Sequence, residues 1–419
     1  MRHPRTWLAC SGAFVVLVCM PRDADAQIEA IPPRTFEAPA RAITIAVSSD
    51  LLYDTNVAKG SDAAAVLRGV KKKDVRVAPI AAINLSLPSG AALFTARGSV
   101  GYEYYARNER LNRERIDLTG GMMLPLASCV IEPEAAYTRR QNDLLDLSID
   151  PDEPIRSTVN VQTTGRVEAT VHCGPAEGIR PGGFVSYGRT KNSAAMRRAQ
   201  DVEMLGYGSE LSFASPTVGI VAAFVRRGDF TYDQRRIAGA AGPAQFQVTA
   251  AGLRIDRRLG ARLQLVGTVS YADVTLPSAF GRGRELDGLN WTLAATLRLG
   301  DRLLVAADSE RVIESSPGFN ANFVRKSSYG GSVTYAVSPL LHLSASMSHR
   351  ERAFQIAPIQ PYLAITGDKT DDATLRLDYV RQRVRFRLNA AYQRRDADRE
   401  LYDYDAFLVS VGISYLFKP

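Results

Sequence analysis

After residue 26 the chain has no apolar run that approaches the roughly 20 residues a membrane-spanning helix requires. A helical membrane protein is therefore excluded. The remaining residues, about 390 of them, would normally suggest two or three soluble domains, yet no shift in composition marks a domain boundary. One continuous architecture is the simpler account.

Histidine is scarce, and beyond residue 26 only His172, His342 and His349 occur. Only His342 and His349 could share a strand, and their odd spacing puts them on opposite faces, so they cannot chelate a metal together. No nucleophile elbow, phosphate loop or dinucleotide fingerprint stands in a strand-to-helix context. We therefore predict no enzyme, no catalytic residue, no metal and no cofactor, although scattered Ser, His and Asp leave a barrel lipase or protease open.

Cysteine is also rare, with four in the chain, of which Cys10 and Cys19 lie in the first 26 residues. Cys129 opens one predicted strand and Cys173 closes the next. Folding that hairpin brings both to the same rim, in an oxidising compartment if the chain is exported. A disulfide and two unpaired thiols are both compatible with this position.

The N-terminal residues indicate export. Arg2 and Arg5 precede an apolar run from Trp7 to Met20, and the small-residue site Ala24-Asp25-Ala26 follows. Residues 1–26 are therefore predicted to be a cleavable signal peptide, since the run is too short to anchor the chain as a helix. The Pro-rich residues 27–41 are predicted to be a periplasmic lead-in, and residues 42–419 a single barrel.

Alternation of apolar and polar residues dominates the remainder of the chain. In VRFRLNAAYQ, residues 384–393, a period of two gives a strand with two unlike faces. Similar segments of about 11 to 16 residues recur from residue 42, separated alternately by eight short turns and nine longer polar breaks. This rhythm predicts an all-β, transmembrane, up-and-down antiparallel barrel of about 18 strands, or 16 if one hairpin is miscounted, with both termini in the periplasm.

A soluble sandwich would also show alternation, but its strands average about five or six residues. In a membrane barrel the charged face must be the inner one, because an unpaired Arg or Lys at the lipid midplane costs roughly 2 to 4 kcal/mol. The predicted lumen-lining residues are Arg76, Arg97, Glu103, Arg115, Asp117, Arg166, Glu168, Arg298, Arg376, Arg385 and Arg387. Such a wall could attract an anionic solute, or its charges could pair off along the wall, and both readings stay open.

Arginines in the longer breaks are expected around the outer mouth. They are Arg110, Arg197, Arg198, Arg235, Arg236, Arg282 and Arg284. Guanidinium groups suit phosphate or carboxylate recognition, which fits either the anionic lipid of the outer leaflet or an acidic polymer. Nucleic acid is not an expected partner, despite the net charge of +8, because the chain is predicted to be exported.

The final segment, SVGISYLF at residues 410–417, resembles the last-strand motif that the barrel insertion machinery of the bacterial outer membrane reads. Gly412, Tyr415 and Phe417 carry this resemblance, although Lys418 and Pro419 follow where such proteins usually end. The resemblance implies an outer-membrane location. The insertion machinery, outer-membrane lipid and lipopolysaccharide are then the expected partners.

An early stretch resembles the beta-barrel porin family of bacterial exopolysaccharide loci, in which Tyr-Asp-x-Asn precedes a Tyr-rich strand and an Asn-Arg hairpin. Here the matching residues are Tyr53, Asp54, Asn56, Tyr102, Tyr104, Tyr105, Asn108, Asn112 and Arg113. The resemblance implies a conduit that exports a polysaccharide with a periplasmic export lipoprotein as partner. Two alternatives are kept: a general or anion-preferring diffusion porin for small solutes, and a non-conducting structural or adhesive barrel.

Overall fold

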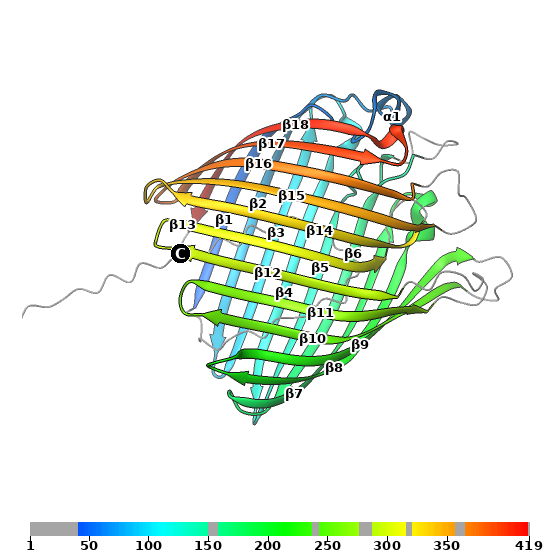
Figure 1. Ribbon diagram of the computed structural model, residues 1–419. Helices are drawn as coiled ribbons and strands as arrows, with labels where there is room; N and C mark the ends of the chain where they lie inside the picture. The colour runs from blue at the N-terminus through cyan, green and yellow to red at the C-terminus, as the bar shows by residue number, and fades with distance from the viewer. Residues whose placement is uncertain are drawn as a thin grey trace, which may run out of the picture.

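The chain folds into a closed β-barrel (Figure 1). A computed structural model describes residues 41–149, 158–236, 243–275, 287–315, 321–356 and 365–417. Within these ranges 18 antiparallel strands pair edge to edge, and β1 closes the sheet by pairing with β18. The predicted 18-stranded, up-and-down antiparallel barrel is confirmed, whereas the predicted signal peptide and nearly all of the lead-in lie outside the described residues.

The strands are 12 to 18 residues long. They are β1 (Ala42–Asp54), β2 (Asp74–Ser89), β3 (Ala92–Tyr105), β4 (Arg113–Leu126), β5 (Cys129–Gln141), β6 (Val161–Cys173), β7 (Gly178–Asn192), β8 (Val202–Ser215), β9 (Gly219–Arg236), β10 (Pro243–Leu259), β11 (Leu263–Thr275), β12 (Gly288–Leu299), β13 (Leu303–Ser315), β14 (Ala321–Ala336), β15 (Leu341–Ile356), β16 (Gly367–Arg381), β17 (Val384–Ala397) and β18 (Tyr404–Phe417). Between strands, the described residues include a short α-helix, α1 (Asp62–Arg68), and the 3-10 turns η1 (Glu109–Leu111), η3 (Ala195–Gln200) and η5 (Glu400–Tyr402). None of the described helices is long and apolar enough to cross a membrane.

Connections differ in length at the two ends of the barrel. At one end, the short-turn end, neighbouring strands join through a few residues, as at Gly90 and Gly260, whose positive φ angles of 60° and 62° suit glycine. At the opposite, long-loop end lie α1 and the 3-10 turns (Figure 1). Strand β1 starts and β18 finishes at the short-turn end, so the first and last strands meet there.

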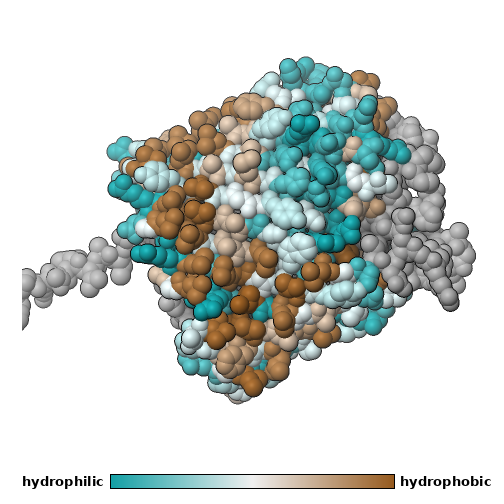
Figure 2. Space-filling view, in the orientation of Figure 1, coloured by the Kyte–Doolittle hydropathy of each residue, from teal (hydrophilic) through white to brown (hydrophobic). Residues whose placement is uncertain are grey.

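Large apolar side chains cover the outside of the wall, where neighbouring positions along each strand point alternately out and in. Leu51 on β1 and Val225 on β9, for example, are 50% and 52% exposed. Figure 2 shows this hydrophobic surface gathered toward the short-turn end, with hydrophilic side chains on β15–β18 toward the long-loop end. A soluble protein rarely exposes so much contiguous apolar surface, so this belt fits contact with lipid.

Two girdles of outward aromatic residues bound the apolar belt, as at the two interfaces of membrane barrels. The girdle nearer the long-loop end contains Tyr53, Tyr102, Tyr104, Tyr187, Tyr207, Tyr271, Tyr329, Tyr392 and Phe407. The girdle nearer the short-turn end contains Phe94, Phe213, Tyr335, Phe386, Tyr415 and Phe417.

Above the first girdle the polarity of the wall reverses on β8–β11. Phe230 on β9 stacks on Phe246 of β10 with ring centroids 4.5 Å apart, inside a buried cluster that includes Met204 and Val274. The outward positions there are polar, for example the exposed Asp273. The simple inward-polar rule therefore holds only within the lipid belt, because beyond it the outer side of a strand contacts water.

Candidate functional site: the lumen

The strand register places all of the predicted lumen-lining residues on the inner face. They are Arg76, Arg97, Glu103, Arg115, Asp117, Arg166, Glu168, Arg298, Arg376, Arg385 and Arg387. In each case the flanking positions on the strand point outward. Within the lipid belt the inner wall is therefore strongly charged.

One row of cross-strand partners on the inner face carries three arginines, one near each end of the lumen and one between them. Starting at Arg298 near the short-turn end of β12, successive cross-strand partners lead through β13, β14 and β15 to Arg376 on β16. The row then continues through Asn389 and β18 to Leu52 and reaches Arg76 near the long-loop end of β2. Because strands in a barrel are tilted, such a row climbs as it winds around the wall.

The inner charges divide into paired and unpaired groups. Arg76 forms an ion pair with Glu103 at 2.9 Å. Arg115 binds Asp117 at 3.1 Å and Arg166 binds Glu168. The other lumen arginines have fewer acidic partners. Asp378 is shared by Arg385 and Arg387 at 3.7 and 3.4 Å, and the described residues contain no ion-pair partner for Arg97, Arg298 or Arg376.

Two connections close much of the long-loop end, and we call them the plug. They are residues 55–73, which contain α1, and residues 142–149. Both are predicted from the sequence to be long polar loops, and the helix within the first was not predicted. The sequence nevertheless carries residues that typically begin and end a helix. Ser61 Oγ accepts the N–H of Ala64 as an N-cap, and Gly69 ends α1 with a φ of 57°.

Buried arginines hold the plug to the wall and to itself. Arg352 on β15 binds both Asp146 of the plug and Asp368 of β16, the latter at 2.6 Å. Arg395 on β17 shares Asp368 and also donates to the carbonyl of Leu145 at 3.0 Å. Both arginines and Asp368 are almost fully buried. Removing the partner of any one of these charges would therefore destabilise the fold.

Arg68 joins the two halves of the plug. From the last turn of α1 it donates to the carbonyl oxygens of Ala58 and of Leu147, the latter at 2.6 Å. Burial lowers the pKa of Arg68 to about 10, so the side chain is still charged at neutral pH. Residues 145–149 are thus bound from the wall and from α1 together.

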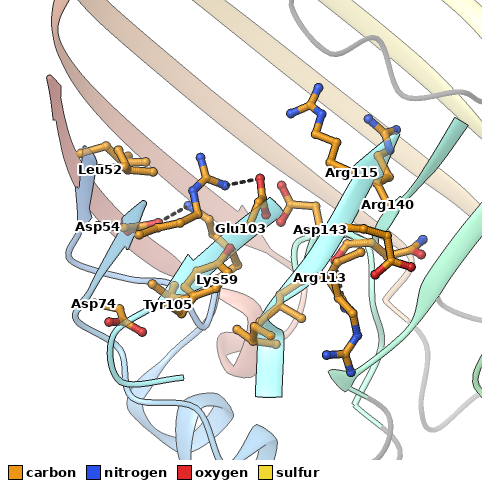
Figure 3. A pocket seen from close by; sticks show the side chains of 18 residues that line it. Leu52, Asp54, Lys59, Asp74, Glu103, Tyr105, Arg113, Arg115, Arg140 and Asp143 are labelled. Atoms are coloured by element: carbon orange, nitrogen blue, oxygen red, sulfur yellow. Dashed lines mark hydrogen bonds and ion pairs between the residues drawn. The ribbon is translucent and has the colours of Figure 1, made fainter. Parts of the chain in front are cut away.

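A cavity of about 310 Å³ is lined in part by residues of both plug connections (Figure 3). Its lining mixes both signs of charge with apolar groups: Leu52, Asp54, Val57, Lys59, Asp74, Arg76, Glu103, Tyr105, Leu111, Arg113, Glu114, Arg115, Arg140, Gln141, Asn142, Asp143, Leu144 and Leu408. Figure 3 shows the dashed ion pairs Arg76–Glu103 and Asp54–Lys59, with Arg115 and Arg140 to one side of them. The lining of the cavity is therefore charged, with both signs represented.

The predicted mouth arginines have different surroundings. Arg198 is exposed, as expected, but Arg197 is buried and donates to Ser148 Oγ at 2.9 Å, so it holds the plug rather than facing solvent. Arg110 donates to the carbonyl of Arg68, and Arg235 stacks on Tyr232. Arg236 ends β9, and Arg282 and Arg284 lie outside the described residues. Arg197 lies at the long-loop end, but a buried contact with residues 142–149 takes up its donors.

Cys129 and Cys173 form a disulfide at the short-turn base of the β5–β6 hairpin. Tyr415 and Phe417 of the last-strand segment face outward, with ring centroids 4.6 Å apart. Gly412 faces inward, where the Asp50 side chain lies over it. No group of His, Cys, Asp and Glu that could hold a metal occurs among the described residues.

No family model matches the sequence, and no curated protein matches it either. Among solved structures it resembles OccK2 (OpdF) of Pseudomonas aeruginosa in complex with glucuronate, at 12% identity and a TM-score of 0.47, over 90% of this chain and 98% of that one. A BenF-like porin from Pseudomonas fluorescens Pf-5 gives 10% identity and a TM-score of 0.47 over 91% and 99%. OccAB3 of Acinetobacter baumannii gives 11% and 0.46 over 91% and 100%.

Similarity at this level describes a broad likeness of shape, and the barrel is established by its own strand pairing. None of the comparisons supports the resemblance to the porin family of exopolysaccharide loci.

Proposed function

We propose that the chain is an outer-membrane porin through which small solutes diffuse, with a preference for anions. The apolar belt between two aromatic girdles supports a membrane location, and a closed barrel of 18 strands is wide enough for an aqueous channel. By the usual topology the short turns then face the periplasm and the long loops face outward.

The observation that carries the anion preference is the excess of unpaired arginine on the inner wall. Arg97, Arg298 and Arg376 have no acidic partner among the described residues, and Arg385 and Arg387 share one. Fixed positive charge in a narrow wet channel raises the local concentration of anions and lowers that of cations. The alternative that inner charges merely pair off accounts for Arg76 and Arg115 but not for these residues.

Polysaccharide export, which the sequence resemblance implied, has less support than diffusion of small solutes. Residues 55–73 and 142–149 are held at the long-loop end by the Arg352–Asp146 ion pair and by the hydrogen bond from Arg68 to the carbonyl of Leu147. A polymer leaving the cell would have to pass beside them. The cavity of about 310 Å³ that the plug lines in part suits a small solute better than a long chain.

Planar-bilayer recording tests this proposal. In a KCl gradient, the zero-current potential of the purified protein should have the sign expected when chloride permeates more readily than potassium. The double change Arg97→Gln and Arg376→Gln should lower the chloride-to-potassium permeability ratio by about twofold or more, since both charges lack partners.

Arg394→Gln is the matched control, because Arg394 is an exposed charge on the outer face of β17. It should leave the permeability ratio unchanged. A cation-selective wild type, or equal ratios in all three proteins, would overturn the anion preference.

A further inference from the structure

A second concentration of arginine lies at the rim of the short-turn end. Five exposed arginines at inward-facing positions belong to it, and we call them the basic rim: Arg258, Arg262, Arg298, Arg302 and Arg383. The first four come from the adjacent strands β10–β13 and their turns, and Arg383 comes from the turn before β17. The turns at residues 89–91, 127–128, 215–218 and 337–340 carry no Lys or Arg, so this charge is one-sided.

The basic rim faces the passage rather than the lipid. Leu259 and Leu299 are exposed on the outer face, so their neighbours Arg258 and Arg298 point inward. Arg298 donates its backbone N–H to the carbonyl of Arg262 at 2.7 Å, which puts these two residues opposite each other on the same face. The same backbone contact links Ala336 to Arg302 and Leu416 to Arg383.

The rim charges are uncompensated within the protein as described. None of the five guanidinium groups makes an ion pair or a side-chain hydrogen bond to a described residue. Nearby acids are few: Asp256, Asp301, and Asp378, which already serves Arg385 and Arg387. Like charges directly opposite each other, as Arg262 and Arg298 are, disfavour the sheet unless an anion binds between them.

We propose that the basic rim binds multivalent anions, of the oligophosphate or tricarboxylate class, at the short-turn mouth of the channel. Four adjacent strands span about 14 Å at the usual spacing of about 4.8 Å, which is too wide for one carboxylate and suits several linked anionic groups. Arginine forks bind such groups in pairs of hydrogen bonds. The inference deepens the proposed porin function and rests on it for the passage of the bound solute.

Side-specific block of the current tests the rim. A biotin label on Asp62→Cys identifies the orientation of each channel in the bilayer. This substitution replaces an exposed side chain of α1 at the long-loop end. Inorganic tripolyphosphate added at the short-turn side should reduce the current at about tenfold lower concentration than when it is added at the long-loop side. Raising the salt concentration should weaken the block, as for exposed charges.

The variant Arg262→Gln with Arg298→Gln should weaken the short-turn block about tenfold. Arg257→Gln is the control, because Arg257 adjoins Arg258 on the same strand but points outward. It should leave the block unchanged. Propane-1,2,3-tricarboxylate, used as a second probe, should also block the double variant more weakly than the wild type and Arg257→Gln.

Direct titration separates this proposal from the porin function. Tripolyphosphate binding to the detergent-solubilised protein needs no conduction, and gel mobility before and after heating reports whether each variant is folded. Binding that Arg262→Gln with Arg298→Gln weakens and Arg257→Gln preserves supports the rim even if no current is seen. Equal block from both sides, or unchanged binding by the folded double variant, overturns it.

Discussion

At the scale of single residues, the plug depends on a few buried charges that meet across long stretches of sequence. Arg352 and Asp146 are 206 positions apart, and Arg395 and Leu145 are 250 apart. Asp146 is half-buried, with 17% of its side chain exposed. Burial would raise its pKa, but the charges of Arg352 and Arg350 outweigh burial and lower the pKa below its ordinary 3.8.

Asp146→Asn should loosen residues 142–149, because it leaves Arg352 with one carboxylate in place of two. Breaking one partner from a buried pair typically costs about 3 to 5 kcal/mol. Single-channel recordings should then show a larger mean conductance and more frequent current steps. Asp62→Asn, which removes only an exposed ion pair with Lys72, is the control and should behave as wild type. Identical traces for Asp146→Asn and wild type would show that the Arg352–Asp146 ion pair does not hold the plug in place.

The pH dependence of the plug follows from the same carboxylate. A pKa lowered on folding adds stability that is fully present above the unfolded value of 3.8 and is lost as pH falls through the lower folded value. Wild-type conductance noise should therefore be constant from pH 8 to about 4 and rise only in stronger acid. A rise near pH 6 would point to a different titrating group.

At the scale of elements, the β5–β6 hairpin links the two ends of the molecule. Its base carries the Cys129–Cys173 disulfide, and its far end leads into residues 142–149 of the plug. The cysteines face outward at a cross-strand pair, next to the short turns that precede β5 and follow β6. The disulfide thus closes the loop that contains half of the plug.

Replacing both cysteines by serine should lower stability without changing selectivity. The closed segment spans 44 residues, for which chain entropy suggests about 4 kcal/mol as an upper figure. The barrel should unfold at a lower temperature, measured by heat-dependent gel mobility, while the chloride-to-potassium ratio stays the same. Wild type treated with a reductant should match the variant; an unchanged unfolding temperature in both would show that the disulfide adds no stability.

The same elements show what sequence could and could not supply. Strand number, turn rhythm and the inward facing of residues such as Arg97 and Arg376 were predictable, because a period of two survives in every strand that crosses lipid. The plug was not, because residues 142–149 have no such period and their partners on β15–β18 become neighbours only when the barrel closes. The buried state of Arg197 was missed for the same reason.

At the scale of the whole molecule, the barrel has two surfaces of opposite character. Outward residues such as Phe386 and Leu388 on β17 are exposed and apolar, whereas the alternate residues Arg387 and Asn389 face the lumen. This arrangement is stable only if lipid covers the outside and water fills the inside. The proposed anion selectivity, the plug and the basic rim all require an outer surface in lipid and an inner surface in water.

Thiol accessibility along β17 tests this division most directly. Single cysteines replace residues 386 to 393 in turn, in vesicles that contain the barrel, and a charged, membrane-impermeant maleimide is added. Positions 387, 389, 391 and 393 should react, and positions 386, 388, 390 and 392 should be protected or nearly so. Labelling without this alternation, or stronger at Phe386 and Leu388 than at Arg387 and Asn389, would contradict a lipid-facing wall around a wet, arginine-lined lumen.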